Sequence, residues 1–306
     1  MSATPGRILV IRGGAIGDFV LTLPVLAALR TQFPRARLEV LGYPHIAQLA
    51  LAGGLADALR PIEARPLAGF FARGGALDPE WRDYFAGFQI ILSYLYDPDE
   101  IFQASVRQCG KAQFLAAPHR PDDAAGRHAT EVFLQPLERL AIFGPDPVPR
   151  LPISSTSPAG NLIAAHPGSG SPRKNWPLEK WEALLKNLLR DPARQFLLVG
   201  GEADLPAMEH LVRVLPAAQI ELALRLPLAE LAARLAGCRA FIGHDSGVSH
   251  LAAAVGRPGL VLWGDTVEAV WRPRGDGVKI LRAASGLATL PVERVREELV
   301  ALDGGR

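Results

Sequence analysis

A chain of 306 residues is long for a single hydrophobic core, which favours two domains. Its 49% hydrophobic and 21% charged residues are typical of a globular protein, and a net charge of +2 with interspersed signs argues against a nucleic-acid partner. No apolar run reaches the length of a membrane span, and the run after Arg7 is too short for the core of a signal peptide, so we expect a cytoplasmic protein. Cys109 and Cys238 lie far apart in the sequence and are expected to be buried free thiols.

The first half of the chain alternates apolar, strand-like runs with helical patterns. Pro24 is expected to kink or restart the first helix. The segment 64–83, rich in Gly, Pro and Arg, is expected to be a loop with a short helix. Such alternation is typical of a parallel sheet covered on both faces. The predicted strands are residues 7–12, 38–41, 58–62, 89–92 and 112–116.

A stretch rich in Pro and Ser at residues 144–158 indicates a linker between two domains, 1–150 and 151–306. The second domain repeats the pattern of the first, so the fold class is α/β, with two Rossmann-like doubly wound domains facing a central cleft. Ligands of such sheets bind beyond the carboxyl ends of the strands. The final helix is a candidate to pack back on the first domain. Strands are predicted at 162–165, 196–199, near 220, at 240–242 and in the apolar run after Pro258.

A glycine-rich turn, GGAIGD at residues 13–18, follows the first predicted strand. It fails the dinucleotide fingerprint G-x-G-x-x-G, because Ala15 and Asp18 occupy the third and sixth positions. This failure argues against a dehydrogenase. Asp18 fits two roles that can coexist, the N-cap of the next helix and a general base held at the helix start.

Two loops in the second half combine small residues with polar groups. The loop 166–177, HPGSGSPRKNWP, places Arg173 and Lys174 beside a helix start, which suits either a diphosphate site or a solvated basic loop. It is not a Walker motif. The segment 244–247, HDSG, opens an alanine-rich helix that ends near Gly256. This helix is either an ordinary capped helix or an anion site at backbone N–H groups that have no helical partner.

Two weaker patterns concern metals. Asp97-Pro98-Asp99 spells the D-x-D of metal-dependent sugar transferases, but its place before a helical segment favours a helix cap. His166, His244 and His250 have no zinc-ligand spacing. No metal site is therefore predicted.

Three stretches resemble motifs of glycosyltransferase family 9, the ADP-heptose:lipopolysaccharide heptosyltransferases and their relatives. They are ILVIRGGAIGDFVLTLPVLAALR, HPGSGSPRKNWPLEKW and HDSGVSHLAAAVGRP, in the order of the family. The resemblance implies a glycosyltransferase B-type fold, whose first domain binds the acceptor and whose second domain binds the nucleotide-sugar. It also implies an inverting, metal-independent transfer of a sugar, heptose from ADP-heptose, onto a lipopolysaccharide core or related glycan. The ADP-sugar is then a substrate, and no cofactor is implied.

The resemblance also implies roles for individual residues. Asp18 is the implied general base. Asp265 and Glu268 depart from the family pattern after Gly264 and leave the identity of the donor sugar open. Acceptor contacts are sought among the arginines Arg60, Arg65, Arg73 and Arg120. The implied donor-binding and phosphate-binding residues are Ser169, Lys174, Glu202, Leu226, Asp245, Ser246, Gly247 and His250.

The implied partners are a nucleotide-sugar donor and a glycan acceptor. No nucleic acid or obligate protein partner is expected, and a peripheral contact with the cytoplasmic face of the inner membrane is compatible with such an acceptor. Two alternatives stay open. One is a nucleotide-binding relative that has lost or changed its activity, and the other is an epimerase or hydrolase that acts on a nucleotide-sugar without an acceptor.

Overall fold

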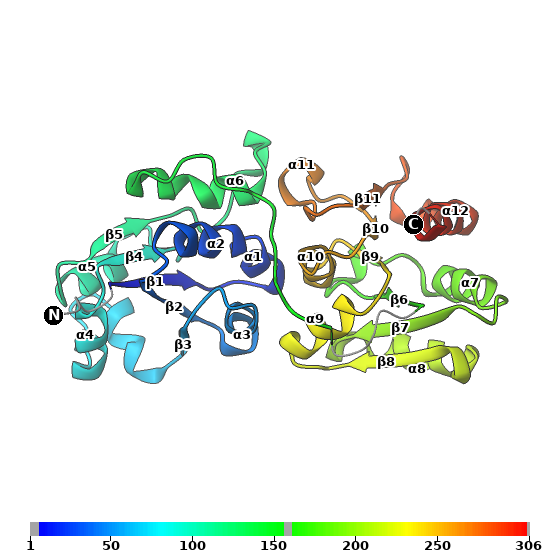
Figure 1. Ribbon diagram of the computed structural model, residues 1–306, viewed down its shortest axis with the longest axis horizontal. Coiled ribbons are helices and arrows are strands. Elements are labelled where there is room, and N and C mark those ends of the chain that lie inside the picture. Colours follow the sequence, from blue (N-terminus) through cyan, green and yellow to red (C-terminus); the bar gives the residue numbers. More distant parts are fainter. Residues whose placement is uncertain (1–5, 156–160, 305–306) are drawn as a thin grey trace. The chain divides into compact units, whose positions relative to one another are not determined.

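The computed structural model describes residues 6–155 and 161–304, and it divides the chain into two compact units, Met1–Pro147 and Val148–Arg306. In each unit a sheet is flanked by helices (Figure 1). Part of the predicted linker, residues 156–158, lies outside the described residues. Across the described ranges, no helix has both the length and the apolar character needed to span a lipid bilayer.

The N-terminal unit is built on a parallel sheet with the strand order β3-β2-β1-β4-β5. Its strands are β1 (Arg7–Arg12), β2 (Arg37–Gly42), β3 (Ala58–Pro61), β4 (Ile90–Ser93) and β5 (Gln113–Ala116). Its helices are α1 (Ile16–Val20), α2 (Leu23–Gln32), α3 (Pro44–Ala52), α4 (Pro79–Ala86), α5 (Ile101–Arg107) and α6 (Ala129–Leu134), with 3₁₀ turns at Arg65–Phe71, Asp123–Ala125 and Gln135–Leu140.

Alternate residues of the central strands form the core of this unit. Leu9 and Ile11 of β1 and Ile91 of β4 are fully buried against a cluster of aromatic side chains. This is the period of two expected for one face of a strand. The aromatic residues come from the 65–71 turn, from α4 and its flank, from α5 and from β5, and are Phe70, Trp81, Tyr84, Phe85, Phe88, Phe102 and Phe114.

The C-terminal unit is built on a second parallel sheet with the order β11-β10-β9-β6-β7-β8. Its strands are β6 (Leu162–Ala165), β7 (Gln195–Gly200), β8 (Ile220–Leu224), β9 (Ala240–His244), β10 (Gly259–Leu262) and β11 (Val278–Leu281). Its helices are α7 (Leu178–Leu188), α8 (Leu205–Val214), α9 (Leu228–Ala236), α10 (Gly247–Ala254), α11 (Glu268–Trp271) and α12 (Val292–Gly304), with 3₁₀ turns at Pro172–Lys174, Glu202–Asp204, Ala217–Gln219 and Leu287–Thr289.

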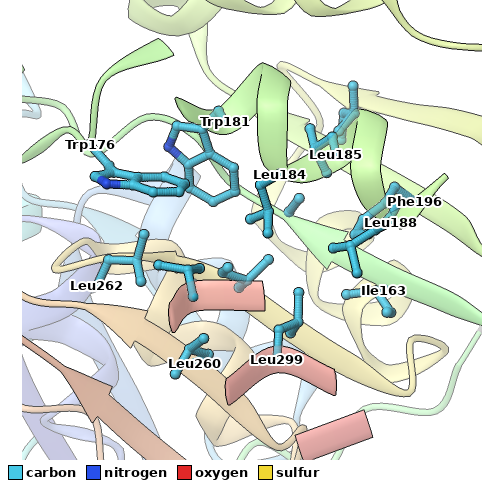
Figure 2. Packing of buried hydrophobic residues seen from close by; sticks show 14 of the residues in the cluster. Ile163, Trp176, Trp181, Leu184, Leu185, Leu188, Phe196, Leu260, Leu262 and Leu299 are labelled. Atoms are coloured by element: carbon cyan, nitrogen blue, oxygen red, sulfur yellow. The ribbon is translucent and has the colours of Figure 1, made fainter. Parts of the chain in front are cut away.

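The core of the C-terminal unit packs the apolar face of α7 on the sheet. Figure 2 shows Trp181, Leu184 and Leu188 of α7 in one cluster with Leu262 of β10 and Leu299 of α12. Helix α12 contacts α7, β9 and β10 of its own unit, and its packing on the first unit stays a prediction.

The predicted α/β class and the two parallel-sheet units are confirmed. Pro24 restarts a helix as expected, because α1 ends at Val20 and α2 begins at Leu23. Asp97 acts as a helix cap, since its carboxylate accepts hydrogen bonds from the N–H groups of Phe102 and Gln103 at 3.2 and 2.9 Å. Both cysteines are free, although Cys109 is only half-buried.

The structure also differs from the sequence prediction at Asp18 and at β11. Asp18 is the third residue of α1, whose N-cap is Ala15, so the N-cap interpretation of Asp18 is wrong. Strand β11 was not predicted, because Val278 to Leu281 alternates partly exposed residues with only one buried residue, as is usual at the edge of a sheet.

His244 ends β9 and is fully buried. Its Nε2 accepts hydrogen bonds from the backbone N–H of Trp176 at 2.9 Å and from the indole N–H of Trp181 at 3.4 Å. The proton therefore lies on Nδ1, which donates to the carbonyl of Gly168 at 3.1 Å. Burial lowers the pKa of His244 to about 4, so the ring is neutral at pH 7 and joins β9 to the loop after β6.

We predict that the C-terminal unit loses stability as the pH falls from 7 to 5. Unfolding lets His244 take up a proton at its ordinary pKa near 6.5, whereas the folded ring stays neutral to about pH 4. Acidification therefore favours the unfolded chain, by about 2 kcal/mol at pH 5 for this residue. Urea denaturation at pH 7, 6 and 5 measures the effect. In His244→Asn, which cannot titrate, the loss should be smaller by that amount, and equal losses in the two proteins would contradict the prediction.

Candidate functional site

Strand order places the loops of the C-terminal unit. The order reverses between β9 and β6, which lie side by side, and at such a switch point the loops leave in opposite directions and open a crevice at the carboxyl ends of the strands. The loop 166–177 follows β6, and Asp245 and Ser246 follow β9. The two sequence-predicted loops therefore belong to neighbouring strands.

An ion pair joins these loops. Lys174, in the 3₁₀ turn Pro172–Lys174, places its Nζ 2.6 Å from Oδ2 of Asp245. The Asp245 side chain is 8% exposed and that of Lys174 is 38% exposed. The buried carboxylate therefore holds a lysine whose side chain stays partly exposed to solvent. This geometry was not predictable from the spacing of 71 residues between the two groups.

A second polar chain runs from Ser246 to Asp204. The hydroxyl of Ser246 lies 3.3 Å from Nδ1 of His166, and Nε2 of His166 lies 3.4 Å from Oδ2 of Asp204. The hydrogen bond from His166 is the main cause that lowers the pKa of Asp204. Gly168 permits this arrangement, because a Cβ at that position would lie 1.8 Å from an Asp204 carboxylate oxygen. The arrangement fixes the orientation of the Ser246 hydroxyl.

Helix α10 begins at this point. Ser246 is its N-cap residue by backbone conformation, but its side chain contacts His166 and does not cap the helix. Gly247 is the first helical residue, and the first N–H groups of a helix have no carbonyl partner within it. His250 lies one turn further on and is 5% exposed. The helix start therefore offers backbone donors beside the Lys174 ammonium.

The other residues that were predicted to bind the nucleotide-sugar follow neighbouring strands of the same sheet. Ser169 uses its hydroxyl within its own loop, donating to the carbonyl of Ser171 at 2.8 Å and lying 2.5 Å from Oδ1 of Asn175. Glu202 is exposed in the turn after β7, and Leu226 is half-buried between β8 and α9. Ser169 thus shapes the loop, whereas the Glu202 carboxylate is open to solvent.

In the N-terminal unit, Asp18 lies beyond the end of β1. Its Oδ2 accepts a hydrogen bond from the N–H of Ala15 at 3.0 Å, and its Oδ1 lies 3.6 Å from Nη2 of Arg12. The side chain is 29% exposed. Gly14 has a φ of 97°, and a Cβ there would lie 2.8 Å from Asp18 Oδ2. The glycine turn therefore makes room for a carboxylate with a fixed direction.

Arg12 is the buried partner of Asp18. Its side chain is 3% exposed and lies over the rings of Phe133 and Tyr94, 4.5 and 5.5 Å from their centroids. Its Nη1 donates to the carbonyl of His119 at 2.8 Å. Burial lowers the pKa of Arg12, and the Asp18 charge opposes that shift. The aromatic faces and the hydrogen bonds offset part of the cost of burying the guanidinium.

Sequence reasoning missed Arg12, Asp204 and the linking roles of His166 and His244. Arg12 and His244 each end an apolar run. A polar residue at the carboxyl end of a buried strand is a signal in the sequence that could have identified both as residues near the site.

The acidic residues after β10 do not form a metal site. Glu268 pairs with Arg272 at 3.3 Å and Arg282 at 3.7 Å, while Asp265 is exposed. Among the described residues, no group of three His, Cys, Asp or Glu side chains is arranged to hold a metal ion.

Comparisons with known proteins fit this arrangement. Residues 150–297 match the model of "Glycosyltransferase family 9 (heptosyltransferase)". The chain is 32% identical over 130 residues to lipooligosaccharide heptosyltransferase 2 of Haemophilus influenzae, covering 41% of this chain and 37% of that protein. It is 29% identical over 162 residues to lipopolysaccharide heptosyltransferase 2 of Escherichia coli, covering 46% of each. The chain thus spans less than half the length of these curated relatives.

The whole fold also has a solved counterpart. The crystal structure of the glycosyl transferase family 9 protein from Veillonella parvula matches 100% of this chain and 99% of its own, with a TM-score of 0.79 and 20% identity. This likeness confirms the predicted glycosyltransferase B-type fold of two Rossmann-like units. Within the C-terminal unit, residues 150–297 are thus similar to glycosyltransferase family 9.

Proposed function

We propose that the protein transfers a sugar, heptose from ADP-heptose, to a lipopolysaccharide core or related glycan, with inversion and without a metal ion. The observation that carries this proposal is the Lys174–Asp245 pair beside the start of α10 at the switch point of a family 9 unit. An accessible ammonium and free backbone N–H groups are the donors that a diphosphate requires. The N-terminal unit would bind the acceptor and the C-terminal unit the donor.

The proposed chemistry is a single displacement. An acceptor hydroxyl attacks the anomeric carbon while Asp18 takes its proton, and the bond from that carbon to the diphosphate oxygen breaks with its electron pair leaving on ADP. Lys174 and the N–H groups of Gly247 and Val248 stabilise the negative charge of the departing diphosphate. The exposed Glu202 carboxylate is suited to accept hydrogen bonds from the ribose hydroxyls.

We place this reaction in the cytoplasm. The protein would contact the inner membrane peripherally, where such acceptors are assembled. The assay that tests the proposal incubates the protein with ADP-heptose and a core acceptor and detects the extended glycan. Free sugar formed from the donor alone would identify a hydrolase instead, and an isomerised donor would identify an epimerase. ADP binding without any turnover would identify a nucleotide-binding relative.

We predict that Asp18→Asn lowers kcat about 10²- to 10⁴-fold, because the amide cannot accept the hydroxyl proton. The ADP dissociation constant, measured by calorimetry, should stay within about twofold of the wild type, which is below a 1 kcal/mol change. Asp83→Asn, an exposed position on α4, is the matched control and should leave kcat unchanged. Transfer that survives in Asp18→Asn would remove Asp18 from the role of base.

We predict that Lys174→Ala weakens ADP binding about 10- to 100-fold, which is the loss expected for a hydrogen bond to a charged group. Lys186→Ala removes an exposed lysine of α7 that pairs with Glu182 and should leave ADP affinity unchanged. Calorimetric titration with ADP measures both variants. Equal affinity of Lys174→Ala and the wild type would exclude Lys174 from the diphosphate site.

A further inference from the structure

A pocket of about 240 Å³ lies in the N-terminal unit beyond the ends of β4 and β5. Ser93 is the last residue of β4, and Tyr96 and Asp97 follow it. Gln103 comes from α5, and His119 follows β5. The strand order of this unit reverses between β1 and β4, so the pocket adjoins its switch point.

Two buried polar side chains line the pocket without full hydrogen bonding. Gln103 is 7% exposed, and its amide forms no hydrogen bond within the described part of the chain. Ser93 is 4% exposed, and its Oγ accepts a 3.4 Å hydrogen bond from the N–H of Leu95. No acceptor for the Ser93 hydroxyl proton is found in the ranges that the structure describes. Neither side chain is among the fully enclosed polar groups without a partner in the described residues, so their polar atoms stay open to the pocket and are available to a ligand that both donates and accepts.

The rim of the pocket carries an aromatic surface. The Tyr96 side chain is 72% exposed, and its ring lies 4.7 Å from the imidazole of His119. A large exposed aromatic ring gains from contact with the C–H face of a ligand. The hydroxyls of the same ligand would then face the polar side chains of Ser93 and Gln103. A polyol with one apolar face therefore fits both parts of the pocket.

The charge of the pocket selects among such ligands. Asp97 and Glu100 line the pocket, and among the described residues no Lys or Arg lines it. Both oxygens of Asp97 are engaged by the N–H groups of Phe102 and Gln103. A phosphate or carboxylate group on the ligand would find no cation here. The pocket therefore suits a neutral sugar ring.

The pocket is joined to the proposed base by one residue. Arg12 donates to the carbonyl of His119 at 2.8 Å and lies 3.6 Å from Asp18. Ser93 is also the register partner of Ile11, the residue before Arg12. Pocket and carboxylate thus stand at the same edge of one sheet.

We propose that this pocket holds one neutral sugar ring of the glycan acceptor, stacked on Tyr96 and hydrogen-bonded to Gln103 and Ser93. The inference rests on the proposed function, since it names the acceptor subsite of that reaction. The pocket volume is below the range of about 300–1,000 Å³ typical of drug-sized ligands, which suits one ring rather than a longer chain. The ring next to the reacting hydroxyl would be positioned by Tyr96 and His119.

The test combines two variants with one control. Tyr96→Ala removes the stacking surface, and Gln103→Leu removes the amide while keeping an apolar side chain of similar size. Phe143→Ala is the control, because Phe143 belongs to the same unit and is also 72% exposed, yet lies outside the pocket. KM for the acceptor, KM for the donor and the melting temperature are measured for each protein. Binding of dephosphorylated core oligosaccharide is followed separately by saturation-transfer NMR.

Each pocket variant should raise the acceptor KM between about twofold and tenfold, with the donor KM unchanged. Gln103→Leu should keep the melting temperature, because within the described residues the Gln103 amide forms no hydrogen bond that the substitution would remove. A drop in melting temperature with an unchanged acceptor KM would show that Gln103 is structural and would overturn the proposal. So would acceptor KM values equal to that of Phe143→Ala.

The NMR measurement separates this proposal from the proposed function. If the wild type transfers no sugar but binds the oligosaccharide, and Tyr96→Ala weakens the binding while Phe143→Ala does not, the reaction is wrong and the sugar subsite stands. If the wild type transfers sugar and the variants bind the oligosaccharide as well as the wild type, the reaction stands and the subsite is wrong. Absence of oligosaccharide binding to the wild type would overturn the subsite in either case.

Discussion

The three hydrogen bonds of the neutral, buried His244 hold together the site of the C-terminal unit. They fix the loop after β6 at both ends, through the carbonyl of Gly168 and the N–H of Trp176. The position of Lys174 between these two points follows from that restraint. Because Trp176 and Trp181 belong to the core, the loop that carries Lys174 is anchored to the buried core of the unit.

In the N-terminal unit a charged residue, Arg12, holds the loop beside the proposed site. Arg12 ends β1 as His244 ends β9, and both strands adjoin the switch point of their sheets. Each side chain turns inward and satisfies backbone groups of a neighbouring loop, which leaves the site residue itself exposed. Arg12 also forms an ion pair with Asp18, which orients the Asp18 carboxylate and leaves it partly exposed. A neutral ring suffices in the C-terminal unit, where the charged pair is formed by Lys174 and Asp245.

Local sequence patterns predicted the helices and strands where apolar runs were long. They did not predict features that depend on contacts between residues far apart in the sequence. The strands around the two switch points, the restart of the helix at Pro24 and the cap formed by Asp97 all follow from local patterns. The N-cap role of Asp18 failed because the helix starts two residues earlier than the carboxylate. The pairing of Lys174 with Asp245 spans 71 residues, and no local pattern specifies which loops meet. Edge strand β11 carries Lys279 outward and has no apolar run to reveal it.

The burial of Asp245 restrains how a diphosphate can be bound. If a ligand drew Lys174 away, it would leave a carboxylate with 8% of its side chain exposed and no opposite charge, which is costly. A diphosphate therefore gains most by approaching the exposed side of the ammonium while the pair with Asp245 stays formed. In that arrangement Asp245 repels a ligand that comes too deep, and the α10 N–H groups attract it from the other side. In the proposed diphosphate site, Asp245 would then act by orienting the Lys174 side chain, which accounts for a buried carboxylate beside a proposed anion.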